Sequence, residues 1–375
     1  MMHAARRDAM GRGRLPANMD MDTVIDAARL RRFMERAYRA EGFSGDEAAQ
    51  IADVLMQADL FGIESHGAQR MMYYHRNIAS GSVAIGAQPE VLRETPVSAL
   101  MDGHFAMGQL TARRAMGLAI EKAKKSGVGM VAVRNSSHYG IAGYYTLMAE
   151  REGLASFSMT NTGPIMTPTF GREMMLGTNP LAFCMPADPV PFWFDASTTV
   201  VTLGKVEVYA KRGKPMPEGW TIDADGRTCT DAQRMNRSIL AGEPGGVLPL
   251  GGEGETHSGH KGYGLALMVE ALTGVLAQGL MAPEMCGAHG DHTSHFFLAF
   301  DPGLFGDAQA IRAQMSRYLA MLRASAPAPG QARIYTHGEK AFEAQALRLR
   351  EGVPVEANTL RELDEIAAEL GIGGV

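Results

Sequence analysis

Apolar residues recur at helical spacing near the start of the chain. Between residues 22 and 38 they fall three or four positions apart, with arginines on the other face, which predicts an amphipathic helix. Gly42 is expected to end this helix. Ser44 and Glu47 have the spacing of a capping box, so a second helix should begin there and continue to Ala58. This helix pair is interpreted as structural.

The pattern changes near residue 85, where short apolar runs alternate with longer helical segments. The predicted strands cover residues 97–101, 128–133, 154–160, 181–185, 192–194 and 295–300. The predicted helices cover residues 112–125, 142–152, 265–276 and 308–322, with a further helix after Asp195. A proline-rich stretch at 326–330 leads to two last helices. The final one should start at Asn358 or Thr359, with Glu362 completing its cap.

This order of elements predicts an α/β (α+β) protein assembled from three parts. Residues 22–84 and 301–375 are expected to meet as one helical domain, because helical segments flank the chain at both ends. Residues 85–300 form the inserted α/β domain around a sheet. Residues 1–21 contain four arginines and no apolar run, so they are interpreted as a disordered extension rather than a signal peptide.

Composition narrows the class of protein. The chain has 375 residues, of which 46% are hydrophobic and 21% charged, which is typical of a soluble globular protein with a sizeable core. Its net charge of −5 argues against a nucleic-acid or anionic-membrane binder. The most apolar long stretch, residues 263–282, contains Glu270 and three glycines, so it predicts a buried helix and not a membrane span. The three cysteines are too far apart for a disulfide framework, so we expect a cytoplasmic protein.

Two familiar nucleotide-binding fingerprints fail on inspection. The nearest match to the Rossmann pattern G-x-G-x-x-G, at residues 127–132, precedes a predicted strand instead of opening a helix. The nearest match to a phosphate loop, at residues 254–261, has His260 before the lysine. Gly262 then replaces the hydroxyl residue that would hold magnesium. Neither segment is therefore interpreted as a nucleotide-binding motif.

Two short polar motifs carry the strongest signals for catalysis. The segment that contains Ser65, His66 and Arg70 combines a hydroxyl, an imidazole and a planar guanidinium, which together could bind a carboxylate. The alternative is a helix cap with a surface arginine. His138 follows a predicted strand and precedes a helix, where a histidine can act as general acid or base, so it is the leading catalytic candidate. The alternative is a histidine that bonds loop backbone.

Weaker signals suggest a site for phosphate or ribose oxygens. Two loops of small polar residues, 160–164 and 177–180, lie beside predicted strands, although ordinary turns have the same composition. Asp195 should lie at a strand end, where it could orient a histidine, accept from a ribose hydroxyl or simply cap a helix. Lys261 lies where the long apolar helix begins, a position suited to phosphate or to a plain glycine-rich start.

A metal site is considered and not favoured. Histidines and an acidic residue gather near Cys286, but their spacing matches no familiar metal motif. We interpret them as a polar loop leading into a strand. The residues concerned are His289, Asp291, His292 and His295.

In combination, seven segments in order resemble the malate/L-lactate dehydrogenase family, which lacks the Rossmann fold. The resemblance runs from about residue 22 to about residue 360, through ADLFGIESHGAQRMMYY, NSSHYGIAGYY, TNTGP, LGTNPLAFCMP, FDASTT, GHKGYGLALMVEALTG and IYTHGE. It implies a non-Rossmann NAD-binding domain on a largely antiparallel sheet, a helical domain formed from both termini, and a homodimer. NAD is the expected cofactor, with NADP as the alternative.

The resemblance also implies roles for particular residues. His138 would exchange a proton with the substrate oxygen, Arg70 would anchor a small carboxylate substrate, and Ser65 and His66 would lie beside the reacting carbon. The cofactor positions implied are Thr162, Asp195, Ala196, Ser197, Lys261, His337, Gly338 and Glu339.

Departures from the family pattern bear on the substrate. Many relatives have Asp-Met-Ala-Thr where this chain has Asp-Ala-Ser-Thr at 195–198, so side-chain contacts at Ala196 do not carry over. Residues 239–259 form a longer stretch than in the ureidoglycolate branch, and residues 136–143 are closer to the malate and lactate members. We therefore expect a 2-hydroxy or 2-oxo acid of malate or L-lactate type. Ureidoglycolate, sulfolactate or cyclic imino-acid reduction are the alternatives. A nucleotide-sensing protein without chemistry is disfavoured, because His138 and Arg70 are both present.

Overall fold

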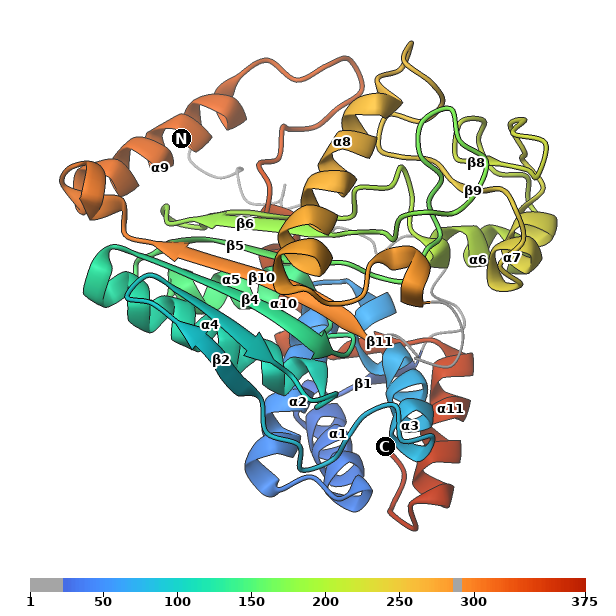
Figure 1. Ribbon diagram of the computed structural model, residues 1–375, viewed down its shortest axis with the longest axis horizontal. Helices are drawn as coiled ribbons and strands as arrows, with labels where there is room; N and C mark the ends of the chain where they lie inside the picture. The colour runs from blue at the N-terminus through green and yellow to red at the C-terminus, as the bar shows by residue number, and fades with distance from the viewer. Residues whose placement is uncertain (1–22, 286–291) are drawn as a thin grey trace, which may run out of the picture.

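A seven-stranded sheet forms the centre of the molecule (Figure 1). The computed structural model describes residues 23–285 and 292–375. Only β3 and β4 pair in parallel, and every other neighbouring pair in this sheet is antiparallel. The predicted mixed fold on a largely antiparallel sheet is therefore confirmed. In spatial order the strands are β2 (Glu90–Glu94), β3 (Ser98–Asp102), β4 (Val128–Ser136), β10 (Thr293–Phe300), β5 (Ala155–Thr160), β6 (Leu181–Met185) and β7 (Phe192–Ala196).

Helices cover both faces of this sheet because its central strands alternate apolar residues between two cores. Val131 and Val133 of β4 belong to the larger core, which the residues of α4 (Gly108–Ser126) and α5 (Ala142–Glu150) share. Ala132 faces the opposite way and packs with Val269 of α8 (Gly259–Glu270). The long apolar helix expected to reach residue 276 changes to a π turn at Ala271–Val275.

Segments from the two ends of the chain lie side by side at the bottom of Figure 1. They comprise α1 (Ala27–Glu41), α2 (Gly45–Leu60), α3 (Met71–Ala79) and α11 (Ala357–Glu369). Strand β1 (Thr23–Ile25) pairs antiparallel with β11 (Val353–Val355), a pairing that the sequence did not predict. The capping box of Ser44 and Glu47 is confirmed. The cap expected from Glu362 is wrong, because Glu356 accepts the first amides of α11.

The division into two domains stays a prediction. One apolar core extends from Leu30 of α1 to Phe297 of β10, so the proposed helical and sheet domains share it. Helix α9 (Ala308–Ala324) was assigned to the helical part, yet its Arg312 forms an ion pair with Asp188 just before β7. The extension predicted for residues 1–21 lies outside the described residues.

The elements that follow β7 in the sequence form a smaller group with a core of its own around Val206 and Met235. It includes α6 (Leu203–Lys211), β8 (Thr221–Ile222), α7 (Ala232–Leu240) and β9 (Gly246–Val247). The helix expected directly after Asp195 therefore begins only at residue 203, because Asp195 and Ala196 complete β7. Helix α10 (Glu339–Glu351) precedes β11. Among the residues that the structure describes, no helix is both long and apolar enough to span a bilayer.

Candidate functional site

Five strands of the central sheet bring their loops to one end. Strands β4, β5 and β7 finish there and β6 and β10 begin there, as the register shows: Ser136 pairs with Thr293, Thr160 with His295, and Ala196 with Leu181. The polar segments at 137–140, 161–164, 177–180 and 197–198 therefore gather at this end. Loops at strand ends in such layers are common places for ligands.

The loop that carries His138 is held tightly. Asn135 adopts a left-handed conformation with φ of 51°, and its side-chain amide donates to Asp102 over 2.9 Å. Gly108 allows helix α4 to approach the loop closely, because a Cβ there would lie 2.2 Å from the carbonyl oxygen of Ser137. His138 is thus fixed on a rigid backbone between β4 and α5.

Three aromatic or imidazole rings surround His138. Its Nδ1 lies 2.6 Å from the hydroxyl of Tyr74, and its ring stacks on that of His66 with the centroids 5.5 Å apart. The ring of Tyr73 packs against it edge-on at 5.9 Å. Tyr74 was not singled out in the sequence, because it lies within a helix and outside the short polar motifs.

The electrostatic surroundings of His138 favour its neutral form. Burial lowers its pKa well below 6.5, and the nearby His66, Arg70 and His295 lower it further. Burial and Arg70 also lower the pKa of His66 to about 4. Burial raises the pKa of Tyr74, so its hydroxyl keeps its proton. A neutral imidazole bonded to a neutral hydroxyl can accept or return a proton.

The segment after α2 forms two short 3₁₀ turns, Glu64–His66 and Ala68–Arg70, that face His138. Ser65 Oγ lies 2.9 Å from His66 Nδ1, and Arg70 donates to the carbonyl oxygen of Ser65 over 3.1 Å. Neither turn has a side-chain cap, so the alternative of a helix cap in this segment is wrong. The structure brings Ser65, His66, Arg70 and His138 together, as the site prediction requires.

A buried carboxyl group supports these turns from beneath. Asp59 is 2% exposed and accepts the amide of Ala68 over 2.8 Å. Burial raises its pKa to about 7. Gly67 is necessary for this contact, because a Cβ at that position would lie 1.9 Å from Asp59 Oδ1. An acidic residue near the end of an otherwise buried helix was a signal that the sequence analysis passed over.

Asp195 links the end of β7 to the helix that follows His138. Its carboxylate accepts the amide of Gly143, in the first turn of α5, over 2.7 Å. The indole of Trp193 donates to the carbonyl oxygen of the same glycine over 2.9 Å. Burial raises the pKa of Asp195 to about 6. Asp195 therefore caps α5 across the sheet, instead of capping the next helix in its own segment.

The remaining cofactor candidates are connected through backbone contacts. Thr162 Oγ1 accepts the amide of Thr178 over 3.0 Å, and the carbonyl of Thr178 accepts the amide of Thr198 over 2.9 Å. Leu250 then donates to Thr198 and packs on Gly262, where a Cβ would lie 2.1 Å from its carbonyl oxygen. Exposed Lys261 lies beside that glycine in the first turn of α8. Ala196 and Ser197 lie between Asp195 and Thr198.

A buried glutamate, whose role in the site was not predicted, connects the two polar loops to α8. Glu270 is 5% exposed and accepts from the side-chain amides of Asn161, over 3.0 Å, and Asn179, over 2.8 Å. It also accepts the amide of Ala282 over 3.0 Å. The π turn follows Glu270 directly, and such turns occur often at functional sites.

The late segment with His337, Gly338 and Glu339 lies against the edge strand β7. The carbonyl of His337 accepts the amide of Trp193 over 3.3 Å, and its ring packs between Phe192 and Phe194. Glu339 pairs with Arg323 of α9 over 2.9 Å. This segment therefore borders the same strand as Asp195, but on the outer side of the sheet.

The comparison with known families decides the relationship. A family model described as malate/L-lactate dehydrogenase matches residues 25–364. The chain belongs to the malate/L-lactate dehydrogenase family. The resemblance drawn from its seven motifs is thereby confirmed.

Individual relatives cover most of this malate/L-lactate dehydrogenase family member. It is 42% identical over 349 residues to malate dehydrogenase of Pyrococcus horikoshii, spanning 92% of this chain and 95% of that protein. It is 31% identical over 339 residues to ureidoglycolate dehydrogenase (NAD(+)) of Escherichia coli, spanning 88% and 92%. The crystal structure of malate dehydrogenase from Entamoeba histolytica matches with a TM-score of 0.90 at 33% identity, spanning 94% and 99%.

The histidine cluster considered as a metal site is divided in this family member. His295 is buried within β10, where Thr160 and Ser136 bond its two ring nitrogens at 2.8 and 2.9 Å. Burial lowers its pKa to about 3, so it acts as a neutral hydrogen-bonding spacer. Cys286, His289 and Asp291 lie outside the described residues. Within residues 23–285 and 292–375, no three metal-ligating side chains converge.

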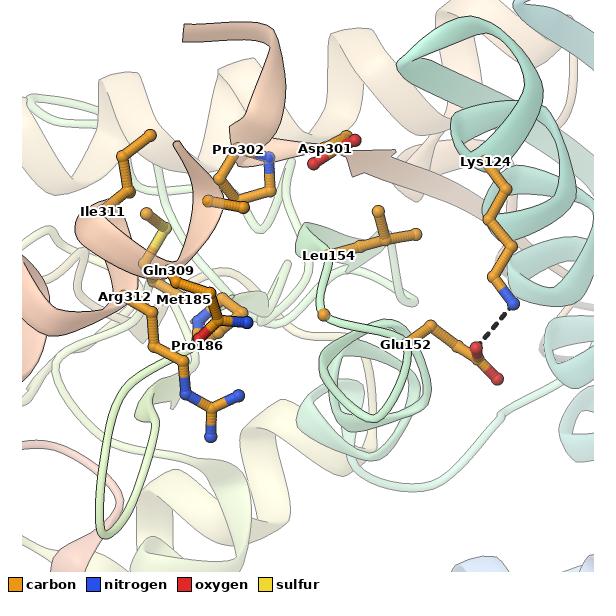
Figure 2. Close-up of a pocket in the computed structure, with 12 residues that line it drawn as sticks. Lys124, Glu152, Leu154, Met185, Pro186, Asp301, Pro302, Gln309, Ile311 and Arg312 are labelled. Atoms are coloured by element: carbon orange, nitrogen blue, oxygen red, sulfur yellow. Dashed lines mark hydrogen bonds and ion pairs between the residues drawn. The ribbon is translucent and has the colours of Figure 1, made fainter. Parts of the chain in front are cut away.

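A cavity of about 300 Å³ lies at the opposite end of the sheet (Figure 2). Leu154, Met185 and Pro302 contribute apolar walls, while Lys124 and Arg312 border it. None of the predicted site residues of this dehydrogenase family member lines it. It is therefore separate from the candidate site.

Proposed function

We propose that this protein is an NAD(P)-dependent oxidoreductase that transfers hydride between nicotinamide and C2 of a small 2-hydroxy or 2-oxo acid, of malate or L-lactate type. The observation that carries the proposal is the position of half-buried His138, which stacks on His66 and lies at the hydroxyl of Tyr74, with Arg70 in the same cluster. Membership of a dehydrogenase family supports the coarser statement, an oxidoreductase acting on hydroxy acids.

His138 has the surroundings of an acid–base group. In the oxidative direction the neutral ring takes the hydroxyl proton of a 2-hydroxy acid at Nε2, and in the reductive direction the imidazolium returns it to the ketone oxygen. When Nε2 is the base, Nδ1 carries a hydrogen in both protonation states and donates it to the hydroxyl oxygen of Tyr74, so this 2.6 Å bond persists. The ring thus keeps its orientation while its charge changes.

Arg70 has the chemistry of a carboxylate anchor. Its Nε bonds the carbonyl oxygen of Ser65, which holds one edge of the guanidinium in place. A carboxylate bound to its other edge would offset the positive charge that lowers the pKa of His138. Substrate binding would therefore raise the pKa of His138 toward pH 7.

The polar loops fit a dinucleotide. The hydroxyls of Thr162 and Ser197 and the ammonium of Lys261 are donors of the kind that ribose and phosphate oxygens accept. When bound, nicotinamide supplies or accepts the hydride. Asp195, Ala196 and the 337–339 segment would border it, and a relative whose name specifies NAD(+) supports NAD over NADP.

We also propose that the protein forms a homodimer and that it is cytoplasmic. Helix α9 has 17 residues but buries Leu319 alone within the described chain, leaving Tyr318 and Met321 exposed. Helix α8 likewise exposes Leu267 and Met268. A second copy could cover these apolar faces. The buried free thiols of Cys184 and Cys229 are consistent with a reducing compartment.

A spectrophotometric screen tests the proposed function. Oxaloacetate, pyruvate and other 2-oxo acids would be supplied with NADH and NADPH in turn, and absorbance of the reduced cofactor followed. We expect the reduced cofactor to be consumed when a small 2-oxo acid is supplied. Turnover of cyclic imino acids alone would contradict the substrate class, and no turnover with any combination would contradict the function.

A further inference from the structure

Helix α10 contacts both halves of the candidate site. Its first residue, Glu339, belongs to the 337–339 segment that packs on β7. Near its other end, Arg348 reaches the turns that carry Ser65 and Arg70. Glu339 and Arg348 are nine positions apart, roughly 14 Å along a helix axis.

Arg348 braces the segment 59–64 in two ways. Its guanidinium donates to the backbone carbonyl of Asp59 over 2.5 Å and forms an ion pair with Glu64. The side chain of Arg348 is 15% exposed, so the arginine is largely shielded from water, whereas that of its partner Glu64 is 49% exposed. Asp59 in turn accepts the amide of Ala68. The carboxyl of Asp59 therefore holds the second turn through Ala68, and Arg348 holds the first turn through Glu64.

Three aromatic rings join the same elements. Phe342 of α10 packs on Phe61, at the root of the turns, with centroids 5.2 Å apart. Phe61 also packs on Trp193 of β7 at 4.9 Å, and Trp193 contacts Phe342 at 6.3 Å. Gly338 fits closely here, since a Cβ would lie 3.1 Å from Trp193 Cβ. A shift of the 337–339 segment would thus be transmitted to Phe61 and to α10.

We propose that α10 couples the two halves of the site. Arg348 is a positioning residue that holds the 64–70 turns in the geometry that binds a carboxylate, and a dinucleotide that bonds residues 337–339 fixes α10 and so tightens carboxylate binding at Arg70. Linkage requires the reciprocal effect, in which the carboxylate tightens dinucleotide binding by the same factor. This inference rests on the proposed function.

A matched pair of variants on α10 tests the coupling. Arg348→Gln removes the brace, whereas the control Arg350→Gln, two residues later, removes an exposed arginine that pairs with Glu351 on its own helix. NADH affinity is measured by fluorescence with and without oxalate. In the wild type and in Arg350→Gln we expect oxalate to tighten NADH by about fivefold or more. In Arg348→Gln the ratio should fall close to one.

Equal ratios in Arg348→Gln and the wild type would overturn the inference, as would a wild type in which oxalate leaves NADH affinity unchanged. If Arg348→Gln does not fold, Glu64→Gln replaces it, because it removes the ion pair and keeps the bond to the Asp59 carbonyl. A reduced ratio is then expected, and an unchanged ratio would contradict the coupling.

Hydrogen exchange separates this inference from the proposed function. If the wild type binds no NADH, the proposed function fails, and amide exchange over residues 61–70 still reports on the brace. Faster exchange there in Arg348→Gln than in Arg350→Gln would support the positioning role. The same exchange in both variants would contradict it.

Discussion

Ionisable groups have different surroundings at the two ends of the central sheet. At the candidate site, ionisable groups are withdrawn from water: burial lowers the pKa of His138 and raises that of Asp195 to about 6. At the cavity, Lys124 pairs with Glu152, as Figure 2 shows, and Arg312 pairs with Asp188; all four side chains are partly exposed. Burial therefore disfavours the charged forms of His138 and Asp195 at one end, whereas ion pairs stabilise the charged groups at the other.

This difference indicates where proton transfer is feasible. His138, with its lowered pKa, is neutral near pH 7, and Asp195, with a pKa of about 6, can still take up a proton close to that pH, so the site favours proton transfer. The paired surface charges at the other end are already satisfied and screened. The cavity there has room for a ligand, but its neighbouring charges stabilise each other: the bond between Arg312 and Asp188 raises the pKa of the arginine and lowers that of the aspartate.

The largest effect should follow from removing the imidazole. His138→Ala is expected to lower kcat by about 10²–10⁴-fold, the usual contribution of general acid–base catalysis. Stopped-flow or steady-state absorbance of NADH measures it, while NADH binding should stay near the wild-type value. Full turnover by His138→Ala would remove the basis for distinguishing this end of the sheet.

A smaller loss is expected at the carboxylate anchor. Arg70→Lys keeps the charge but loses the planar donor pair, so KM for the 2-oxo acid should rise by roughly 10-fold to 150-fold, as for a lost charged hydrogen bond. The change belongs mainly in KM, since His138 is untouched. An unchanged KM would show that the carboxylate binds elsewhere.

Removing the partner of His138 should have a milder effect. Tyr74→Phe deletes the hydroxyl at 2.6 Å, for which a loss of about 2-fold to 13-fold in kcat is expected. Without this bond the ring can rotate, so the limbs of the pH–rate profile should move as well. A uniform loss of stability with unchanged kcat and profile would instead assign Tyr74 a packing role.

His75 tests whether a displaced pKa by itself identifies the site. Burial opposes its charge, but bonds to Glu369 and Glu41 outweigh burial and raise its pKa. Protonated His75 joins α3 to α1 and α11. Because the folded-state pKa is raised, its contribution to stability is fully present below about pH 6.5 and is lost as pH rises through the folded value.

His75→Gln should therefore destabilise the fold by about 1 kcal/mol near pH 6 and by less near pH 9. Urea unfolding at both values measures this, with kcat at pH 7.5 as the control. A larger loss at pH 9 than at pH 6 would contradict the sign. Loss of kcat without loss of stability would place His75 with the catalytic groups.

Local pattern predicted those parts of the molecule that local physics decides. The run at 181–185 is strongly apolar and became β6 as predicted, and Ser44 capped its helix. Strand β2 was missed because its sequence, EVLRE, is charged and mostly exposed. Strand β11 was missed because it is three residues long and contains a proline, and its partner β1 is more than 300 positions away.

The residues of the candidate site likewise differ in whether the sequence could predict them. Arg70 and His138 lie in compact polar motifs that stand out in a sequence. Tyr74 and Glu270 do not, because each lies within a helix and outside such motifs. Tyr74 meets His138 across 64 positions and Glu270 meets Asn161 across 109, so only the fold brings these partners together.

The smallest effect is expected at the opposite end of the sheet. Lys124→Gln breaks the pair with Glu152, whose side chains are 50% and 46% exposed, and exposed pairs contribute about 0.2–1 kcal/mol. Activity should stay within about twofold of the wild type, because this pair is exposed to solvent and belongs to none of the contacts around His138. Lys125→Gln, the next lysine on α4, controls for the loss of charge. If Lys124→Gln alone changed kcat, the cavity would have to communicate with His138 through the strands of the sheet.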